Sequence, residues 1–212
     1  MVPGIIEMKL ATTLMAGWMA AASPVPVPAG AVAMMLEFRV ATPVEVKLYD
    51  ENLRVDATVL LNRDGSADDE TTKQVKHLFR CRQTDREAKF SEGTLAMLAD
   101  IADRYEGKTI EFVSAVRRTR SESRTSPHRH ARALDFRIRG MQLREIRDYL
   151  WRTYHHAGIG WYPGDQFIHM DARPELTDMS WTFLNGKNHY HPYWSELARQ
   201  PAVPAEPRKP GV

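Results

Sequence analysis

The chain has 212 residues, 43% of them apolar, and 29 Lys and Arg against 27 Asp and Glu, which suits one globular domain of ordinary size with appendages. A net charge of +2 is too small to make nucleic acid or an acidic membrane the main partner. The single cysteine, Cys81, excludes an internal disulfide and any zinc site built on two thiolates, so a metal would be held by histidines and carboxylates.

The two ends of the chain are predicted to lie outside the fold. Residues 1–33 have the pattern of an export signal, because Lys9 precedes the apolar stretch Leu10–Ala22 and small residues suited to cleavage follow. That stretch is shorter than the ~20 residues of a membrane-spanning helix, so we predict a cleaved signal, with an uncleaved anchor as the alternative. Residues 199–212 are proline-rich and predicted to be disordered.

Between the ends, residues 34–62 are predicted to form N-terminal strands that lead into a single domain at 63–198. Alternating apolar and β-branched residues predict strands at 36–40, 44–49 and 55–61. A short helix is expected over 71–79. Leu95, Leu98, Ala102 and Tyr105 have helical spacing after a Ser91 cap, which predicts a helix that ends before residue 107.

The second half of the domain alternates strands with one further helix. Strands are predicted at 109–115 and 133–138, and a helix over 142–155 that Gly158 ends. Two more strands, at 159–162 and 167–171, are joined by the turn Pro163-Gly164. The fold class is therefore α+β, with helices packed on a mostly antiparallel sheet.

One constellation of residues suggests a metal site. Asp135 lies on a predicted buried strand, on the face opposite Leu134 and Phe136, and a buried acid is destabilising unless something compensates it. A metal would do so, with His128 from the preceding loop and His169 from a neighbouring strand. Two imidazoles and one carboxylate give a three-ligand Zn²⁺ site with a position open to water, which is typical of catalytic zinc.

Four motifs in this order carry a resemblance to a known family: Val113-Ser114-Ala115-Val116-Arg117, Ser126-x-His128-x4-Ala133-x-Asp135, Gly158-Ile159-Gly160-Trp161-Tyr162-Pro163 and Phe167-Ile168-His169-Met170-Asp171. Together they resemble the DUF882 group, a branch of the M15-type zinc peptidases that act on bacterial peptidoglycan. That branch includes D-Ala-D-Ala-type carboxypeptidases and murein endopeptidases. The resemblance covers residues 50–181 and implies an M15-peptidase-like catalytic domain at 63–198.

The resemblance also implies roles for individual residues. It makes His128, Asp135 and His169 the zinc ligands. Arg117 matches the arginine that meets substrate and stabilises developing negative charge. His130, two residues after His128, is the alternative ligand, and only the Ser-x-His register favours His128.

The catalytic base is less well defined by the resemblance. Asp171 matches an acidic residue whose role is either partner to a ligand or proton shuttle. Peptidases of this clan often have Glu at the position of Gln166, which cannot act as a base, so Asp165 and Asp171 are the candidates and Asp171 is favoured. The family also usually has glycine where this chain has Ala131.

The remaining histidines are interpreted as structural. Two are predicted to interact with the last carbonyls of the helix at 142–155, one to lie on the polar face of a helix, and two to lie in an aromatic C-terminal segment that could alternatively bind a second metal. They are His77, His155, His156, His189 and His191. Three aromatic residues are expected to line a substrate groove or to pack in the core: Trp161, Tyr162 and Trp181.

Arginines concentrate at 117–124 and at four later positions: Arg129, Arg132, Arg137 and Arg139. An exported protein seldom meets nucleic acid, so the carboxylates of peptidoglycan suit this charge better, and a solvated loop is the alternative. The predicted function is an exported zinc metallopeptidase, periplasmic or extracellular, that hydrolyses peptide bonds in peptidoglycan stem peptides or cross-links. The alternative is a non-catalytic, zinc-containing wall-binding module on the same fold. No nucleic-acid partner and no stable membrane span are expected.

Overall fold

The structure is a computed structural model that describes residues 42–200. The predicted signal at 1–33, the predicted strand at 36–40 and all but two residues of the predicted tail lie outside the described residues. Among the helices of the described part, none combines the length and the apolar character that crossing a bilayer requires.

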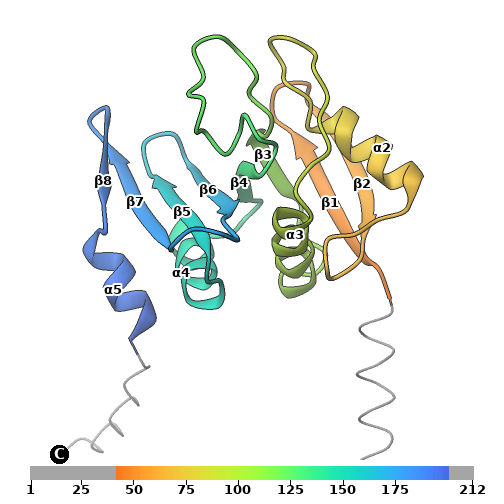
Figure 1. Cartoon of the computed structure of the whole chain (residues 1–212). Helices are drawn as coiled ribbons and strands as arrows, with labels where there is room; N and C mark the ends of the chain where they lie inside the picture. Colours follow the sequence, from red (N-terminus) through yellow and green to blue (C-terminus); the bar gives the residue numbers. More distant parts are fainter. Residues whose placement is uncertain (1–41, 201–212) are drawn as a thin grey trace, which may run out of the picture.

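Eight strands form one sheet in the order β2-β1-β3-β4-β6-β5-β7-β8 (Figure 1). The strands are β1 (Val44–Asp50), β2 (Val55–Leu61), β3 (Ile110–Ser114), β4 (Ala133–Ile138), β5 (Ala157–Tyr162), β6 (Phe167–Ala172), β7 (Met179–Leu184) and β8 (Lys187–Tyr190). The pairs β1–β3 and β5–β7 are parallel, and the other five neighbouring pairs are antiparallel. The predicted α+β class with a mostly antiparallel sheet is thus confirmed.

Four helices complete the described part: α2 (Asp69–Leu78), α3 (Glu92–Arg104), α4 (Leu143–Thr153) and α5 (Tyr193–Arg199). The Ser91 side chain caps α3 by accepting a hydrogen bond from the Thr94 amide, as its sequence predicts. The prediction that Gly158 ends α4 is wrong. The helix stops at Thr153, and Gly158 lies inside β5, where its missing side chain leaves room for a carboxylate described below.

The hydrophobic core lies on one face of the sheet. Leu98 of α3 and Ile146 of α4 belong to the same buried cluster as Phe136 of β4 and Ile159 of β5. Because successive strand residues point to opposite faces, the neighbour of Phe136, Asp135, lies on the other face. That other face carries the polar side chains of the site.

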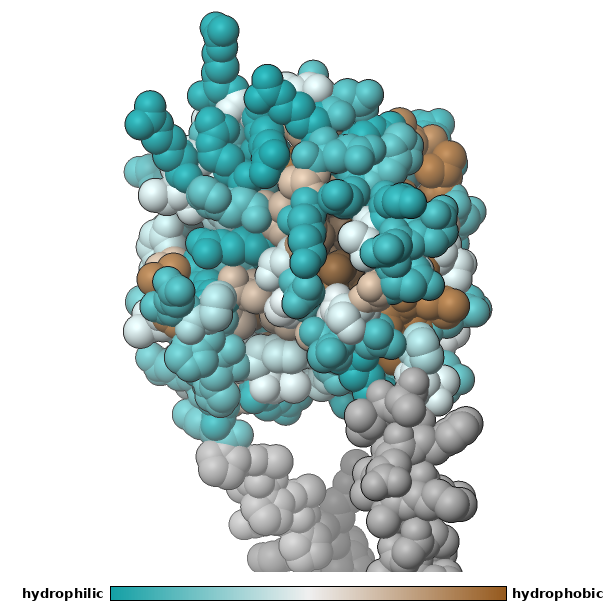
Figure 2. All heavy atoms as spheres, turned by 45° about the vertical axis from the view of Figure 1, so that its right-hand side comes forward, coloured by the Kyte–Doolittle hydropathy of each residue, from teal (hydrophilic) through white to brown (hydrophobic). Residues whose placement is uncertain are grey.

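The outer surface is mostly polar. Figure 2 shows hydrophilic side chains over the face turned toward the viewer, with exposed apolar side chains in separate small groups. Leu53, Val55 and Leu60, on β2 and the turn before it, are about half exposed. Single exposed apolar residues of this kind are normal on a globular domain.

Candidate metal centre

A single row of paired residues crosses the polar face of the sheet. Asp135 on β4 pairs with His169 on β6, and His169 pairs with Gly160 on β5. Gly160 in turn pairs with Trp181 on β7, and Trp181 with Tyr190 on β8. Directly paired residues project from the same face of a sheet. Register alone therefore aligns two candidate ligands with two aromatic side chains.

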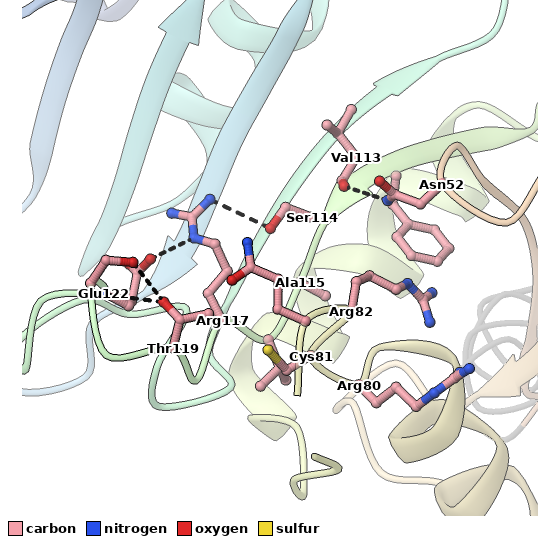
Figure 3. Close-up of a pocket in the computed structure, with 14 residues that line it drawn as sticks. Asn52, Arg80, Cys81, Arg82, Val113, Ser114, Ala115, Arg117, Thr119 and Glu122 are labelled. Carbon is pink, nitrogen blue, oxygen red and sulfur yellow. Dashed lines mark hydrogen bonds and ion pairs between the residues drawn. The ribbon is translucent and has the colours of Figure 1, made fainter. Parts of the chain in front are cut away.

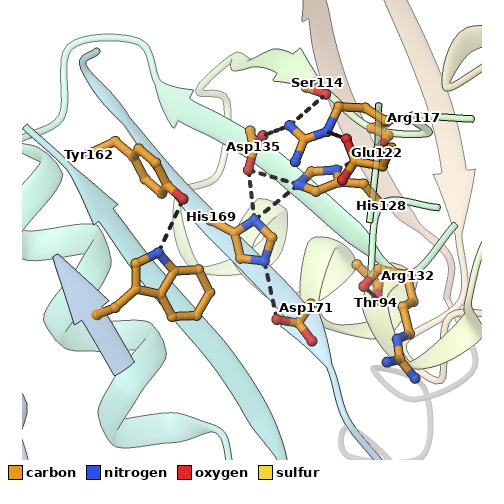
Figure 4. A network of polar contacts seen from close by, with 12 residues as sticks. Thr94, Ser114, Arg117, Glu122, His128, Arg132, Asp135, Tyr162, His169 and Asp171 are labelled. Atoms are coloured by element: carbon orange, nitrogen blue, oxygen red, sulfur yellow. Dashed lines mark hydrogen bonds and ion pairs between the residues drawn. The ribbon is translucent and has the colours of Figure 1, made fainter. Parts of the chain in front are cut away.

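His128 completes the cluster from the loop before β4 (Figure 4). Its Nε2 lies 3.1 Å from His169 Nδ1 and 3.2 Å from Asp135 Oδ1, and His169 Nδ1 lies 2.8 Å from Asp135 Oδ1. All three residues are buried. Four-coordinate zinc with bonds of 2.0–2.1 Å holds its ligand atoms about 3.3 Å apart, so these three atoms need to separate by only a few tenths of an ångström. The donor set and its spacing fit Zn²⁺.

Hydrogen bonds at the back of each imidazole set its orientation. His128 Nδ1 lies 2.6 Å from the carbonyl oxygen of Ala115, which can only accept, so Nδ1 carries a proton and donates it. His169 Nε2 donates in the same way to Asp171 Oδ2, at 3.1 Å. The nitrogens that face the cluster are then free to bind a metal. This second layer of contacts is the usual arrangement behind metal-binding histidines.

Asp171 lies behind His169, away from the cluster (Figure 4). It is fully buried, and its Oδ1 accepts a hydrogen bond from Arg173 Nε at 2.8 Å. Burial raises its pKa, but the contacts with His169 and Arg173 outweigh burial and lower the pKa overall. A Cβ at Gly158 would lie 2.0 Å from Asp171 Oδ2, so glycine is required there. Both carboxylate oxygens are engaged, which matches a partner to a ligand better than a proton shuttle.

Arg117 reaches the cluster from the loop after β3. Its Nη1 lies 3.0 Å from Asp135 Oδ2, and its Nε lies 3.0 Å from Glu122 Oε2. The side chain remains 40% exposed, so part of the guanidinium is open to a ligand. Glu122 was missed by the sequence analysis, since it is a single acid within an Arg- and Ser-rich loop that has no periodic pattern.

A cavity of about 260 Å³ lies beside Arg117, which forms part of its lining (Figure 3). Two further arginines line it, but both are already paired with carboxylates. Arg80 Nε lies 2.6 Å from Asp85 Oδ1, and Arg82 forms an ion pair with the buried Asp50. Cys81, the lone cysteine, is buried there and accepts a hydrogen bond from the Arg118 amide at 3.3 Å. Apart from Arg82 Nη1, which is buried without a hydrogen-bond partner among the described residues, this cavity offers little free charge to a ligand.

The cluster of His128, Asp135 and His169 opens into a groove of about 320 Å³. Its aromatic wall consists of Tyr162, Trp181 and Tyr190, and Arg117 and Arg173 supply its charge. The residues that line the groove within the described part include no Asp or Glu. Trp161, by contrast, points to the helix side, where the Arg147 guanidinium lies 4.5 Å from its ring centre. Of the three predicted groove aromatics, two line the groove and Trp161 packs in the core.

The remaining candidates lie away from the cluster. Asp165 and Gln166 are exposed in the turn between β5 and β6, and Gln166 is about 10 Å from His169 along the strand. His130 is exposed, and its Nε2 contacts the Arg124 carbonyl oxygen at 2.8 Å. Ala131 has a φ of 53°, a conformation that glycine adopts without strain.

Two other histidines, His155 and His156, lie just after α4. The prediction that His155 and His156 interact with the carbonyls that end α4 is wrong, because both bind the segment before β7. His155 Nδ1 lies 3.2 Å from Asp178 Oδ2, and His156 Nδ1 lies 2.9 Å from the Leu176 carbonyl oxygen. Within residues 42–200, the cluster of His128, Asp135 and His169 is the one group of three with metal-binding spacing.

The metal-free protein should lose stability as the pH rises above neutrality. Burial lowers the pKa of His169, but hydrogen bonds to Asp135 and Asp171 outweigh it and raise the pKa to about 9. A pKa that is higher in the folded state than the ~6.5 of the unfolded chain adds stability below pH ~6.5 that is lost as the pH rises through 9. The expected loss in the free energy of unfolding is up to about 3 kcal/mol.

Urea unfolding at pH 6.5 and pH 9, with and without bound zinc, measures this loss. The zinc-loaded protein should not show it, because a neutral His169 binds the metal throughout that range. Equal pH dependence in the two forms would show that His169 does not bind zinc.

Comparison with known proteins relates these residues to a family. The family described as peptidoglycan L,D-endopeptidase MepK, of the peptidase M15 type, matches residues 39–176. One relative is the probable peptidoglycan L,D-endopeptidase MepK of Haemophilus influenzae (strain ATCC 51907 / DSM 11121 / KW20 / Rd), 34% identical over 61 residues. That match spans 29% of this chain and 32% of the relative, or about a third of the relative's length. No solved structure matches the chain.

The matched region contains the cluster, Arg117 and Asp171, and it covers well over half of the chain. The resemblance to the DUF882 branch of the M15-type peptidases, based on the four sequence motifs, is confirmed. The chain belongs to the peptidoglycan L,D-endopeptidase MepK family.

Proposed function

We propose that the protein is an exported zinc metallopeptidase that hydrolyses peptide bonds in peptidoglycan stem peptides or cross-links. The observation that carries the proposal is a buried His-Asp-His cluster whose two imidazoles are oriented from behind and which opens into a groove. The family's description names an L,D-endopeptidase of peptidoglycan, so an L,D bond is the first to test. Export is supported by the predicted signal at 1–33 and by the extracytoplasmic location of such a substrate.

In the proposed reaction, His128, Asp135 and His169 would hold the metal. When bound, zinc polarises a carbonyl and lowers the pKa of a bound water to near 7. Arg117 stands at the edge of the cluster, where its exposed guanidinium can stabilise the negative charge that develops on the carbonyl oxygen of the substrate. Asp171 keeps His169 in the tautomer that binds metal.

A second candidate function is a non-catalytic, zinc-containing wall-binding module. The observation that favours it is the absence of Asp and Glu from the described lining of the groove, where a general base would be expected.

Digestion of purified sacculi separates the two functions. The zinc-loaded protein should release peptide fragments that mass spectrometry identifies, and a chelator should stop the release until zinc is restored. Zinc-loaded protein that binds sacculi and releases no fragment would establish the binding module instead.

Replacing Asp171 by asparagine should weaken zinc binding rather than chemistry. The asparagine amide oxygen can accept the hydrogen bond from His169 Nε2 but lacks the negative charge of the carboxylate, so zinc affinity should fall about 10- to 100-fold. At saturating zinc, kcat should stay within about tenfold of the wild type. Unchanged zinc affinity with a kcat loss of about 10²-fold or more would instead make Asp171 the proton shuttle.

A further inference from the structure

The arginines that are concentrated in one stretch of the sequence fall into two groups in the structure. Arg137 and Arg139 are paired on the sheet with Glu111, at 2.8 and 2.6 Å, and Arg117 is paired at the metal centre. Arg118, Arg120 and Arg129 turn instead toward Arg86 from the loop after α2. These four arginines, with His130, line a concavity of about 510 Å³ that we call the arginine concavity.

No carboxylate of residues 42–200 lies within ion-pair distance of the four guanidinium groups in the arginine concavity. Two of them are held in place by backbone oxygens. Arg118 Nε lies 3.3 Å from the Arg129 carbonyl oxygen, and Arg129 Nη1 lies 3.0 Å from that of Thr119. Arg86 and Arg120 are exposed. Like charges gathered without partners repel each other, and an anionic ligand would relieve that repulsion.

The arginine concavity and the groove share no lining residue, but some of their lining residues are neighbours in sequence. Arg118 follows Arg117, and Arg129 follows His128, so one loop contributes to both sites. We propose that the arginine concavity binds carboxylate groups of the peptidoglycan polymer outside the cleavage groove. The proposal rests on the proposed substrate, and it makes the arginine concavity an anchor for the intact polymer rather than part of the cleavage site.

The double variant Arg86→Gln/Arg120→Gln tests the anchor, because both side chains are exposed. Its matched control is Lys73→Gln/Lys108→Gln, which removes the same charge from exposed positions elsewhere. In sedimentation with sacculi, the arginine variant should bind about tenfold more weakly at low salt, with a shallower salt dependence. The control should match the wild type, and neither variant should change the hydrolysis of a small soluble muropeptide.

Two treatments of the sacculi identify the anion. Blocking carboxylates as amides should remove the difference between variant and wild type, and stripping phosphodiester-linked polymers should leave it. The reverse result, or equal binding by variant and wild type, would overturn the proposal. Because sedimentation requires no cleavage, a lack of hydrolysis would count against the proposed activity without affecting this test.

Tyr162 offers an independent inference inside the groove. Its ring is stacked between Phe167 and Phe183, with ring centres 4.4 and 5.2 Å away. Its hydroxyl oxygen accepts a hydrogen bond from Trp181 Nε1 at 3.1 Å, which leaves the hydroxyl proton for a ligand. Burial raises the pKa of Tyr162, so the phenol stays protonated at neutral pH.

Trp181 contacts both this hydroxyl and His169 of the candidate cluster. The Trp181 ring centre lies 5.0 Å from that of His169, in the space that Gly160 leaves, since a Cβ there would lie 2.4 Å from the indole. Figure 4 shows Tyr162 and Arg117 on opposite sides of the cluster. We infer that the Tyr162 hydroxyl donates a hydrogen bond to the carbonyl oxygen of the scissile amide as negative charge develops on it. This inference also rests on the proposed peptidase activity.

Tyr162→Phe keeps both ring stacks and removes the hydroxyl with the hydrogen bond that it accepts from Trp181, so Tm should fall modestly while zinc content stays unchanged. With a soluble muropeptide, kcat should fall about 10²-fold while KM stays within about twofold. Calorimetry with a phosphinate analogue of the tetrahedral intermediate should show a similar loss of affinity, and this readout does not depend on turnover. Tyr193→Phe, at an exposed side chain of α5 that does not line the groove, is the control. Wild-type analogue affinity in Tyr162→Phe would overturn the inference.

Discussion

Replacement of His128 by alanine is expected to abolish zinc binding and hydrolysis together. His128 Nε2 is one of three donor atoms within about 3 Å of one another, and two protein donors are too few for a three-ligand zinc site. Elemental analysis should show a fall from about one zinc per chain to background. Added zinc should raise the Tm of the wild type and not that of the variant, because only a folded protein that binds the metal is stabilised by it.

His130→Ala is the matched control for this prediction. His130 is exposed and lies two residues away, and its Nε2 contacts a carbonyl oxygen rather than the cluster. It should keep its zinc and its activity to within about twofold. A zinc-loaded, active His128→Ala protein would refute the ligand assignment, and loss of zinc in His130→Ala alone would transfer it to the other histidine.

Arg117→Ala should be the most damaging change that leaves the metal in place. Removing a donor that stabilises an oxyanion typically lowers kcat by about 10²–10³-fold, and Arg117 is the charged group that borders both the cluster and the groove. Zinc should remain near one per chain, because Arg117 contacts Asp135 Oδ2 while Oδ1 faces the two histidines. Steady-state kinetics on a soluble muropeptide, with zinc content measured on the same samples, checks the prediction.

Two variants sharpen the Arg117 test. Arg117→Lys keeps the charge but lacks the planar fork that contacts Asp135 and Glu122 at once, so it should recover only part of the activity. Arg124→Ala removes an exposed arginine of the same loop and should behave as the wild type. If Arg117→Ala retained wild-type kcat and raised only KM, the residue would bind substrate without stabilising the transition state.

The strands that carry the candidate ligands were predictable because the residue pattern of each strand shows which of its faces is buried. Leu134, Phe136 and Ile138 alternate with Asp135 along β4, and this period-2 pattern places the acid on the opposite face whatever the rest of the chain does. The cap and spacing of α3 are equally local. By contrast, β7 and β8 were not predicted as strands, since β8 is exposed along its whole length and shows no buried period.

The candidate ligands could be named from the motifs, but their mutual arrangement could not. The role of Asp171 depends on Gly158, which lies 13 positions earlier in sequence and pairs with it across β5 and β6. Gly158 on its own resembled a helix stop, since a glycine after an amphipathic helix usually ends it. The structure shows its role, because the backbone of β5 at Gly158 passes so close to the Asp171 carboxylate on β6 that a side chain would not fit.

By itself, the sequence determined the α+β class, the residue types of the metal site and the family to which they point. All three depend on short-range periodicity and on motifs, and both can be recognised without knowing how the chain packs. The tertiary structure alone decided that Asp135, His169, Gly160, Trp181 and Tyr190 form one row and that Asp171 lies behind the candidate ligand His169. It also decided that the arginines divide into groups with and without carboxylate partners. These outcomes depend on strand order and register, which long-range pairing sets and no local window of sequence contains.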